Sequence, residues 1–125
     1  MGQSCEIEMA GDTASIRQAR SFVTATLAAW HLERISERAV LLVSELATNA
    51  VLHARTPFRL SVRFDDSVTV EVTDGSAEFP KVETSDRDGD RGRGLLLVSR
   101  LASDWGSRSE SAGKTVWFSL DPGPA

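Results

Sequence analysis

Apolar residues recur every three or four positions in two segments of the first half of the chain. Residues 16–30 and 36–53 carry this spacing, and a break near residues 31–34 separates them. Such spacing places apolar side chains on one face of an α-helix. The pattern therefore predicts two amphipathic helices, the first with Asp12 or Thr13 as its N-cap. Residues 5–9, which precede Gly11, could form a short first strand.

After Pro57 the pattern changes to strict alternation of apolar and polar residues. Positions 58–64 and 68–72 alternate in this way, and Asp65 and Asp66 lie between them. Two half-buried strands joined by a tight turn form a hairpin. Residues 105–107 and 114–120 predict a second hairpin, and a third helix is expected to begin near Gly94. The polar, glycine-bearing stretch 74–93 between the hairpins is predicted to be either a functional lid or a disordered segment, because long loops are rare in compact domains.

The predicted order of elements is strand, two helices, two strands, long loop, helix and two strands. Helices packed on one face of a mainly antiparallel, mixed sheet form a two-layer α+β sandwich. The chain has 125 residues, which suits one domain covering residues 1–125. This order therefore predicts a single α+β domain.

Composition and charge narrow the class of protein. A hydrophobic fraction of 41% is enough for a real core, and the net charge of −4 argues against a nucleic-acid binder. The chain has no apolar run long enough to span a membrane and no signal-peptide pattern at its start. Cys5 is the one cysteine, so no intrachain disulfide can form. We therefore expect a cytoplasmic protein in a reducing compartment.

Three polar residues share one stripe of the second predicted helix. Glu45, Asn49 and His53 lie four residues apart, beside the apolar stripe. They could form an ordinary solvated helix face. Alternatively, an amide oxygen such as that of Asn49 is a hard ligand suited to Mg²⁺, which keeps waters and nucleotide phosphates as its other ligands. A carboxylate one turn away could then orient or deprotonate a hydroxyl group or a water.

Two glycine-containing motifs flank the long polar loop. Asp74-Gly75 follows a predicted strand and is either a turn or a buried carboxylate that accepts a hydrogen bond from an adenine amino group. Gly92-Arg93-Gly94 directly precedes the third predicted helix. This motif is either a plain joint or a helix N-terminus whose backbone N–H groups face an anion.

The run Gly113-Lys114-Thr115 looks like the end of a P-loop. A true P-loop has its first glycine five residues before the second, and that position is Arg108. The residues that follow, VWFSL, indicate a strand instead of the required helix. The P-loop is therefore excluded, which leaves a hairpin turn or a nucleotide contact at the start of a strand.

The order of these motifs resembles that of one protein family. The chain contains, in sequence, ELATNAVLHA, VTDGS, a long polar loop, GRGLLLVSRLASDWG and GKTVWFSL. This series resembles the GHKL ATPase superfamily, which has the Bergerat fold, over roughly residues 12–120. It is most similar to the small bacterial anti-sigma-factor serine kinases and their actinobacterial relatives. The resemblance implies a single GHKL-type ATP-binding domain.

The resemblance also implies a role for each matching residue. Asn49 would bind Mg²⁺, and Glu45 would be the general base. Asp74, with Gly75 beside it, would hold the adenine amino group. Thr115 would support Asp74 or a bound water at the adenine.

The phosphate-facing end of the lid would be formed by Gly92, Arg93, Gly94 and Leu95. Many relatives have an Asp-x-Gly-x-Gly pattern after the adenine-binding aspartate. Here residues 74–78 are DGSAE, so both expected glycine positions differ.

The function implied by the resemblance is that of an ATP-binding, anti-sigma-factor-like regulator. It would have protein serine kinase activity toward an anti-sigma-factor antagonist, with ATP and Mg²⁺ as cofactors. Its partners would be a sigma factor and the antagonist, with no direct contact to nucleic acid or a membrane. Members commonly dimerise, so a homodimer is a further expectation. The alternative is a catalytically inactive, nucleotide-binding partner-switching module that binds a sigma factor or an antagonist; Glu45 favours the kinase.

Overall fold

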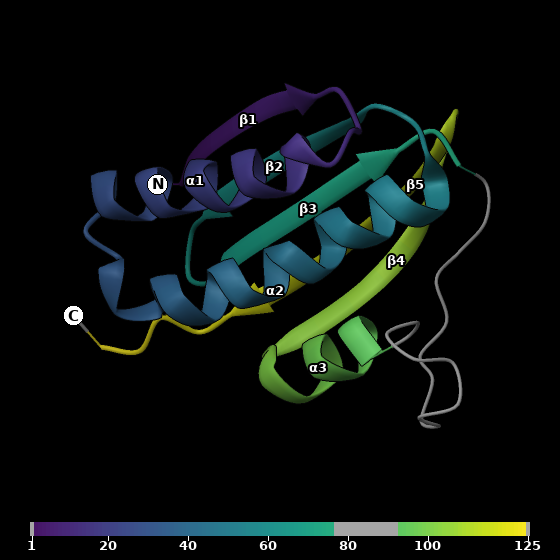
Figure 1. Ribbon diagram of the computed structural model, residues 1–125. Helices are drawn as coiled ribbons and strands as arrows, with labels where there is room; N and C mark the ends of the chain where they lie inside the picture. The colour runs from purple at the N-terminus through teal and green to yellow at the C-terminus, as the bar shows by residue number, and fades with distance from the viewer. Residues whose placement is uncertain (1, 77–92, 125) are drawn as a thin grey trace.

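A five-stranded sheet forms one layer of the protein (Figure 1). The computed structural model describes residues 2–76 and 93–124. Within them the strand order is β1-β2-β3-β5-β4, and all four pairings are antiparallel. The strands are β1 (Gln3–Met9), β2 (Phe58–Phe64), β3 (Val68–Asp74), β4 (Asp104–Glu110) and β5 (Gly113–Leu120). The α+β sandwich is thus confirmed, with a described sheet that is antiparallel throughout.

The described residues form three α-helices, and these lie on one face of the sheet as the second layer (Figure 1). They are α1 (Ala14–Ala29), α2 (Ser36–Asn49) and α3 (Arg93–Leu101), and a 3₁₀ turn, η1 (Glu33–Ile35), joins the first two. Helix α2 packs against both α1 and α3. No helix within residues 2–76 and 93–124 has the length and apolar character needed to cross a membrane.

The start of α1 depends on Gly11 and Asp12. A side-chain oxygen of Asp12 accepts hydrogen bonds from both the backbone N–H and the hydroxyl of Ser15, each at 3.1 Å. Thr13, which directly precedes the helix, makes no side-chain cap. Of the two predicted caps, Asp12 is therefore the one whose side chain accepts from a backbone N–H of the first helical turn. Gly11 has φ of +88°, and a Cβ there would lie 2.3 Å from the backbone oxygen of Thr56.

The end of the second predicted helix is not α-helical. Helix α2 stops at Asn49, and a π-helical turn, η2 (Ala50–Ala54), follows it. The backbone N–H of Arg55 donates to the oxygen of Ala50 at 3.0 Å, and Arg55 itself is left-handed, with φ of 57°. Because this hydrogen bond spans five residues instead of four, the backbone widens immediately after Asn49. Turns of this kind are frequent at functional sites.

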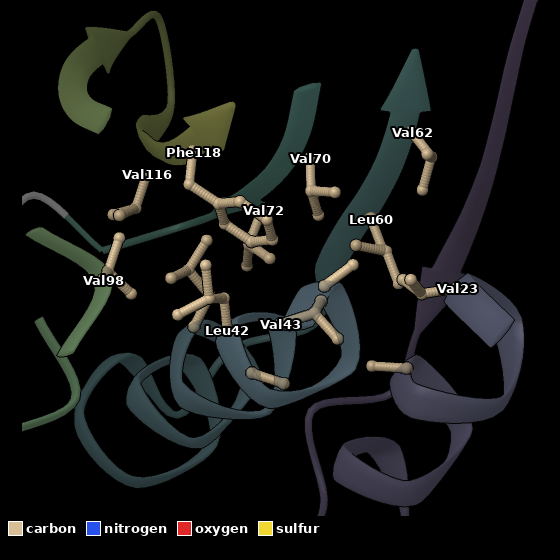
Figure 2. Close-up of a cluster of buried hydrophobic side chains, with 14 of the residues drawn as sticks. Val23, Leu42, Val43, Leu60, Val62, Val70, Val72, Val98, Val116 and Phe118 are labelled. Atoms are coloured by element: carbon tan, nitrogen blue, oxygen red, sulfur yellow. The ribbon is translucent and has the colours of Figure 1, made fainter. Parts of the chain in front are cut away.

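The core lies between the sheet and the helices. Alternate positions of the central strands face the helices, because successive strand side chains point to opposite faces. Figure 2 shows part of this cluster, in which α3 contributes the fully buried Val98. Its other large, fully buried members include Val23, Leu27, Leu42, Val43, Phe58, Leu60, Val62, Val68, Phe118 and Leu120. By the same alternation, the side chains of Asp74, the last residue of β3, and Lys114, the second residue of β5, point to the face of the sheet that the helices cover.

Candidate functional site

Segments from distant parts of the sequence meet at one end of the sandwich. The last residues of β3, the first residues of β5 and the end of α2 with η2 lie at this end (Figure 1). Strand β3 contacts η2, and the backbone N–H of Gly75 donates to the hydroxyl of Thr56 at 2.9 Å. Asp74 is directly opposite Lys114 in the ladder. The structure thus gathers three of the sequence motifs, those containing Asn49, Asp74 and Lys114.

The helical part of the site comes from the last two turns of α2. Glu45 and Asn49 are both partly exposed, while Leu46 between them is buried in the core. Their four-residue spacing within an α-helix keeps them on one side of α2. His53 is exposed and lies in η2, where the α-helical spacing no longer holds. The predicted stripe is therefore present for Glu45 and Asn49 and ends before His53.

Asp74 is a buried carboxylate that also shapes a turn. Its side chain is 3% exposed. Oδ1 accepts a hydrogen bond from the backbone N–H of Ser76 at 2.8 Å, two residues further on, which is the Asx-turn pattern. Gly75 is exposed beside it. Both interpretations of Asp74-Gly75, a turn and a buried carboxylate, therefore hold together.

Lys114 is the partner of Asp74, and sequence reasoning did not find it. Its ammonium nitrogen lies 3.0 Å from each carboxylate oxygen of Asp74, and its side chain is 7% exposed. Each charge of such a buried ion pair is stabilised by the other, because removing one partner leaves the other charge buried and uncompensated. The sequence does indicate that the Lys114 side chain points inward, because Lys114 is in phase with the inward-facing Val116 and Phe118 of the same strand.

Thr115 lies on the opposite face of the sheet from the side chain of Asp74. It is fully buried, and its hydroxyl donates to a carboxylate oxygen of Glu110 at 2.7 Å. The hydroxyl of Thr73 lies 2.6 Å away and donates to Thr115 in turn. The hydrogen bond from Thr115 is the main cause that lowers the pKa of the Glu110 carboxyl, and Arg108 adds to it. The structure does not bring Thr115 to Asp74, because adjacent strand residues point to opposite faces.

The predicted phosphate-facing segment lies at the start of α3. Arg93 is the first residue of this helix and Gly94 the second. Only the backbone of residues 93–95 is described, so the side chains of Arg93 and Leu95 lie outside the description, as does Gly92. Backbone N–H groups in the first turn of a helix have no intrahelical acceptor and favour anions. Helix α3 is held in place by Val98 and by its contacts with α2.

The donor set of the site is compatible with Mg²⁺. In the part of the chain that the structure describes, no three His, Cys, Asp or Glu side chains gather to hold a metal ion. Mg²⁺ does not need such a cage, because it is commonly bound by one or two protein oxygens, with phosphates and waters as the other ligands. The amide oxygen of the partly exposed Asn49 can serve as one of them.

Comparison with known proteins assigns the family. Residues 9–120 match the family described as the histidine kinase-like ATPase domain, so the chain belongs to this family. No curated protein is significantly similar to it in sequence. An ATPase domain binds ATP, which makes this end of the sandwich a candidate nucleotide site.

The fold is also similar to that of a solved structure, the RsbU and RsbW domains of Rv1364c from Mycobacterium tuberculosis. The TM-score is 0.70 at 18% identity, over 94% of this chain and 32% of that chain. This chain therefore spans about a third of that protein's length, and the likeness is one of fold.

Proposed function

We propose that this protein is an ATP-binding regulator of the anti-sigma-factor type that transfers phosphate from ATP to a serine of an antagonist protein. Its membership of an ATPase family supports ATP as the phosphate donor. The RsbW domain in the structurally similar chain supports the comparison with anti-sigma-factor kinases. The observation that carries the proposal is the position of Glu45 and Asn49 one turn apart on α2. They lie at the end of the sandwich where β3 ends with Asp74.

Each chemical task of a kinase site has a candidate group in this arrangement. Asp74 would accept a hydrogen bond from the adenine amino group, and the first turn of α3 would face the phosphates. Asn49 would hold Mg²⁺ through its amide oxygen. Bound Mg²⁺ would neutralise charge on the phosphate oxygens. The nucleotide would therefore extend from the ends of β3 and β5 toward α3.

Glu45 is the proposed general base. Its carboxylate would accept the proton of the serine hydroxyl as the serine oxygen attacks the terminal phosphorus of ATP. The bond from that phosphorus to the bridging oxygen breaks, and ADP leaves with the bond's electron pair. The products are a phosphoserine on the antagonist and ADP. The protein would act in the cytoplasm on a sigma factor and its antagonist, without contacting nucleic acid or a membrane itself.

One observation favours a second candidate function. Residues 74–78 lack the glycines at the two positions expected from the kinase pattern. This difference suits a nucleotide-binding partner-switching module that binds a sigma factor or an antagonist without transferring phosphate.

Phosphate transfer separates the two candidates. The protein is incubated with Mg²⁺, ATP labelled on its terminal phosphate and each candidate antagonist, and phosphoserine is measured by mass spectrometry. The kinase proposal expects phosphoserine that depends on both Mg²⁺ and this protein. Antagonist binding without any phosphoserine would support the partner-switching module instead.

A further inference from the structure

We propose that Lys114 reads the nucleotide base together with Asp74. Its ammonium group would donate a hydrogen bond to ring nitrogen N1 of adenine, while the neighbouring amino group of the base donates to Asp74. This inference rests on the proposed ATP binding and adds a specificity-determining residue to it.

The hydrogen-bonding capacity of the pair is not used up. Within the described residues, Oδ1 of Asp74 accepts from Ser76 and from Lys114, whereas Oδ2 accepts from Lys114 alone. A carboxylate oxygen can accept two hydrogen bonds, so Oδ2 keeps one position. The ammonium group has three hydrogens, and Asp74 is its one acceptor among residues 2–76 and 93–124. One acceptor position on Oδ2 and one hydrogen on Nζ therefore remain, on atoms 3.0 Å apart.

Burial makes this unused capacity significant. The side chains of Lys114 and Asp74 are 7% and 3% exposed. Each buried side-chain nitrogen and oxygen of the described residues, Lys114 Nζ included, already has at least one partner, and a further hydrogen bond formed in such a buried place is electrostatically stronger than one in water. Because the pair is neutral as a unit, an uncharged base can lie against it without burying a net charge.

The strand ladder holds the pair in one arrangement. Asp74 and Lys114 are directly opposite each other in the β3–β5 register. A Cβ on the preceding Gly113 would lie 1.8 Å from the backbone oxygen of Asp74, so only glycine allows the two strands to approach this closely. The donor and the acceptor are therefore presented at a fixed spacing.

Adenine offers the complementary edge. Its amino group is a donor, and ring nitrogen N1 beside it is an acceptor, as in base recognition through the Watson–Crick edge. The amino group matches Oδ2 of Asp74, and N1 matches the remaining hydrogen of Lys114. A carboxylate alone would recognise only the amino group.

Two adenine analogues test the contact directly. Calorimetry on the full chain with Mg²⁺ compares ATP, 1-deaza-ATP, which lacks N1, and 7-deaza-ATP, which keeps it. The parent protein should bind 1-deaza-ATP at least about tenfold more weakly than ATP, the effect of one hydrogen bond to a charged group. It should bind 7-deaza-ATP about as well as ATP. Lys114→Met should bind ATP and 1-deaza-ATP equally, while the control Arg59→Met, an exposed cation on the other sheet face, should behave like the parent.

The outcomes of this experiment distinguish a failure of the Lys114 contact from a failure of the proposed ATP binding. If the parent binds ATP and 1-deaza-ATP equally, or loses affinity only for 7-deaza-ATP, Lys114 does not contact N1, although ATP binding stands. If the parent binds no adenine nucleotide, the proposed function fails and the inference fails with it. The comparison of analogues on the parent decides the matter even if circular dichroism shows that Lys114→Met does not fold.

Discussion

Replacing Lys114 by methionine should destabilise the protein by about 3–5 kcal/mol, the usual cost of removing one member of a buried ion pair. Methionine keeps most of the length and the apolar stem of lysine but removes the charge. The carboxylate of Asp74, 3% exposed, would keep the backbone N–H of Ser76 as its one remaining described donor. Its negative charge would then be buried without compensation, which accounts for the size of the loss.

That loss is large for a domain of this length. Domains typically unfold with a free energy of about 5–15 kcal/mol. At roughly 3–5 °C per kcal/mol for 125 residues, the melting temperature should fall by roughly 10–25 °C. The measurement is urea unfolding followed by circular dichroism at pH 7 without nucleotide, repeated as a thermal melt.

A double-mutant cycle and an exposed control identify the cause. Asp74→Leu with Lys114→Met removes both charges, and replacing a buried pair by apolar residues is often close to neutral. The double variant should therefore be more stable than either single variant. Arg108→Met removes an exposed cation that pairs with Glu71 at 3.2 Å and should cost no more than about 1 kcal/mol. The reasoning is refuted if Lys114→Met costs no more than Arg108→Met, or if the double variant loses the sum of the two single losses.

The remaining predictions concern Glu45, Asn49 and Thr115. Glu45→Ala should keep Mg-ATP affinity within a few-fold and lower phosphate transfer by roughly 10²–10⁴, the span for a lost general base; a parental transfer rate, with the exposed Glu37→Ala as control, would exclude Glu45. Asn49→Ala should abolish Mg²⁺-dependent nucleotide binding and leave the circular dichroism spectrum unchanged, whereas equal Mg-ATP affinity in calorimetry would contradict the metal assignment. Thr115→Val should raise the pKa of Glu110 toward its ordinary value, as followed by carboxyl NMR. Since the folded-state pKa of Glu110 is lowered, its contribution to stability is present above the unfolded-state pKa and is lost as the pH falls through the folded-state pKa, a dependence that Thr115→Val should weaken.

Local periodicity was enough to predict the sandwich. Alternation at positions 58–64 and 114–120 predicted strands, and three-and-four spacing predicted α1 and most of α2. These patterns are reliable because an element must turn its apolar side chains toward one core, whatever lies on the other side of that core. Glu45 and Asn49 could be placed together for the same reason, since a four-residue spacing within one α-helix is a local relation.

Contacts between distant segments were decided by the tertiary structure. The sequence by itself determined that Asp74 ends a strand and that a GKT run begins another, but the ladder register sets Lys114 against Asp74 across 40 residues. A shift of one residue in strand phase moves a side chain to the other face, so Thr115, the neighbour of Lys114, lies on the face of the sheet opposite the side chain of Asp74. The π turn after Asn49 likewise interrupts a helical spacing that continues in the sequence. Periodicity reports which face of its own element a residue occupies, whereas the partner it meets there depends on how the elements pack.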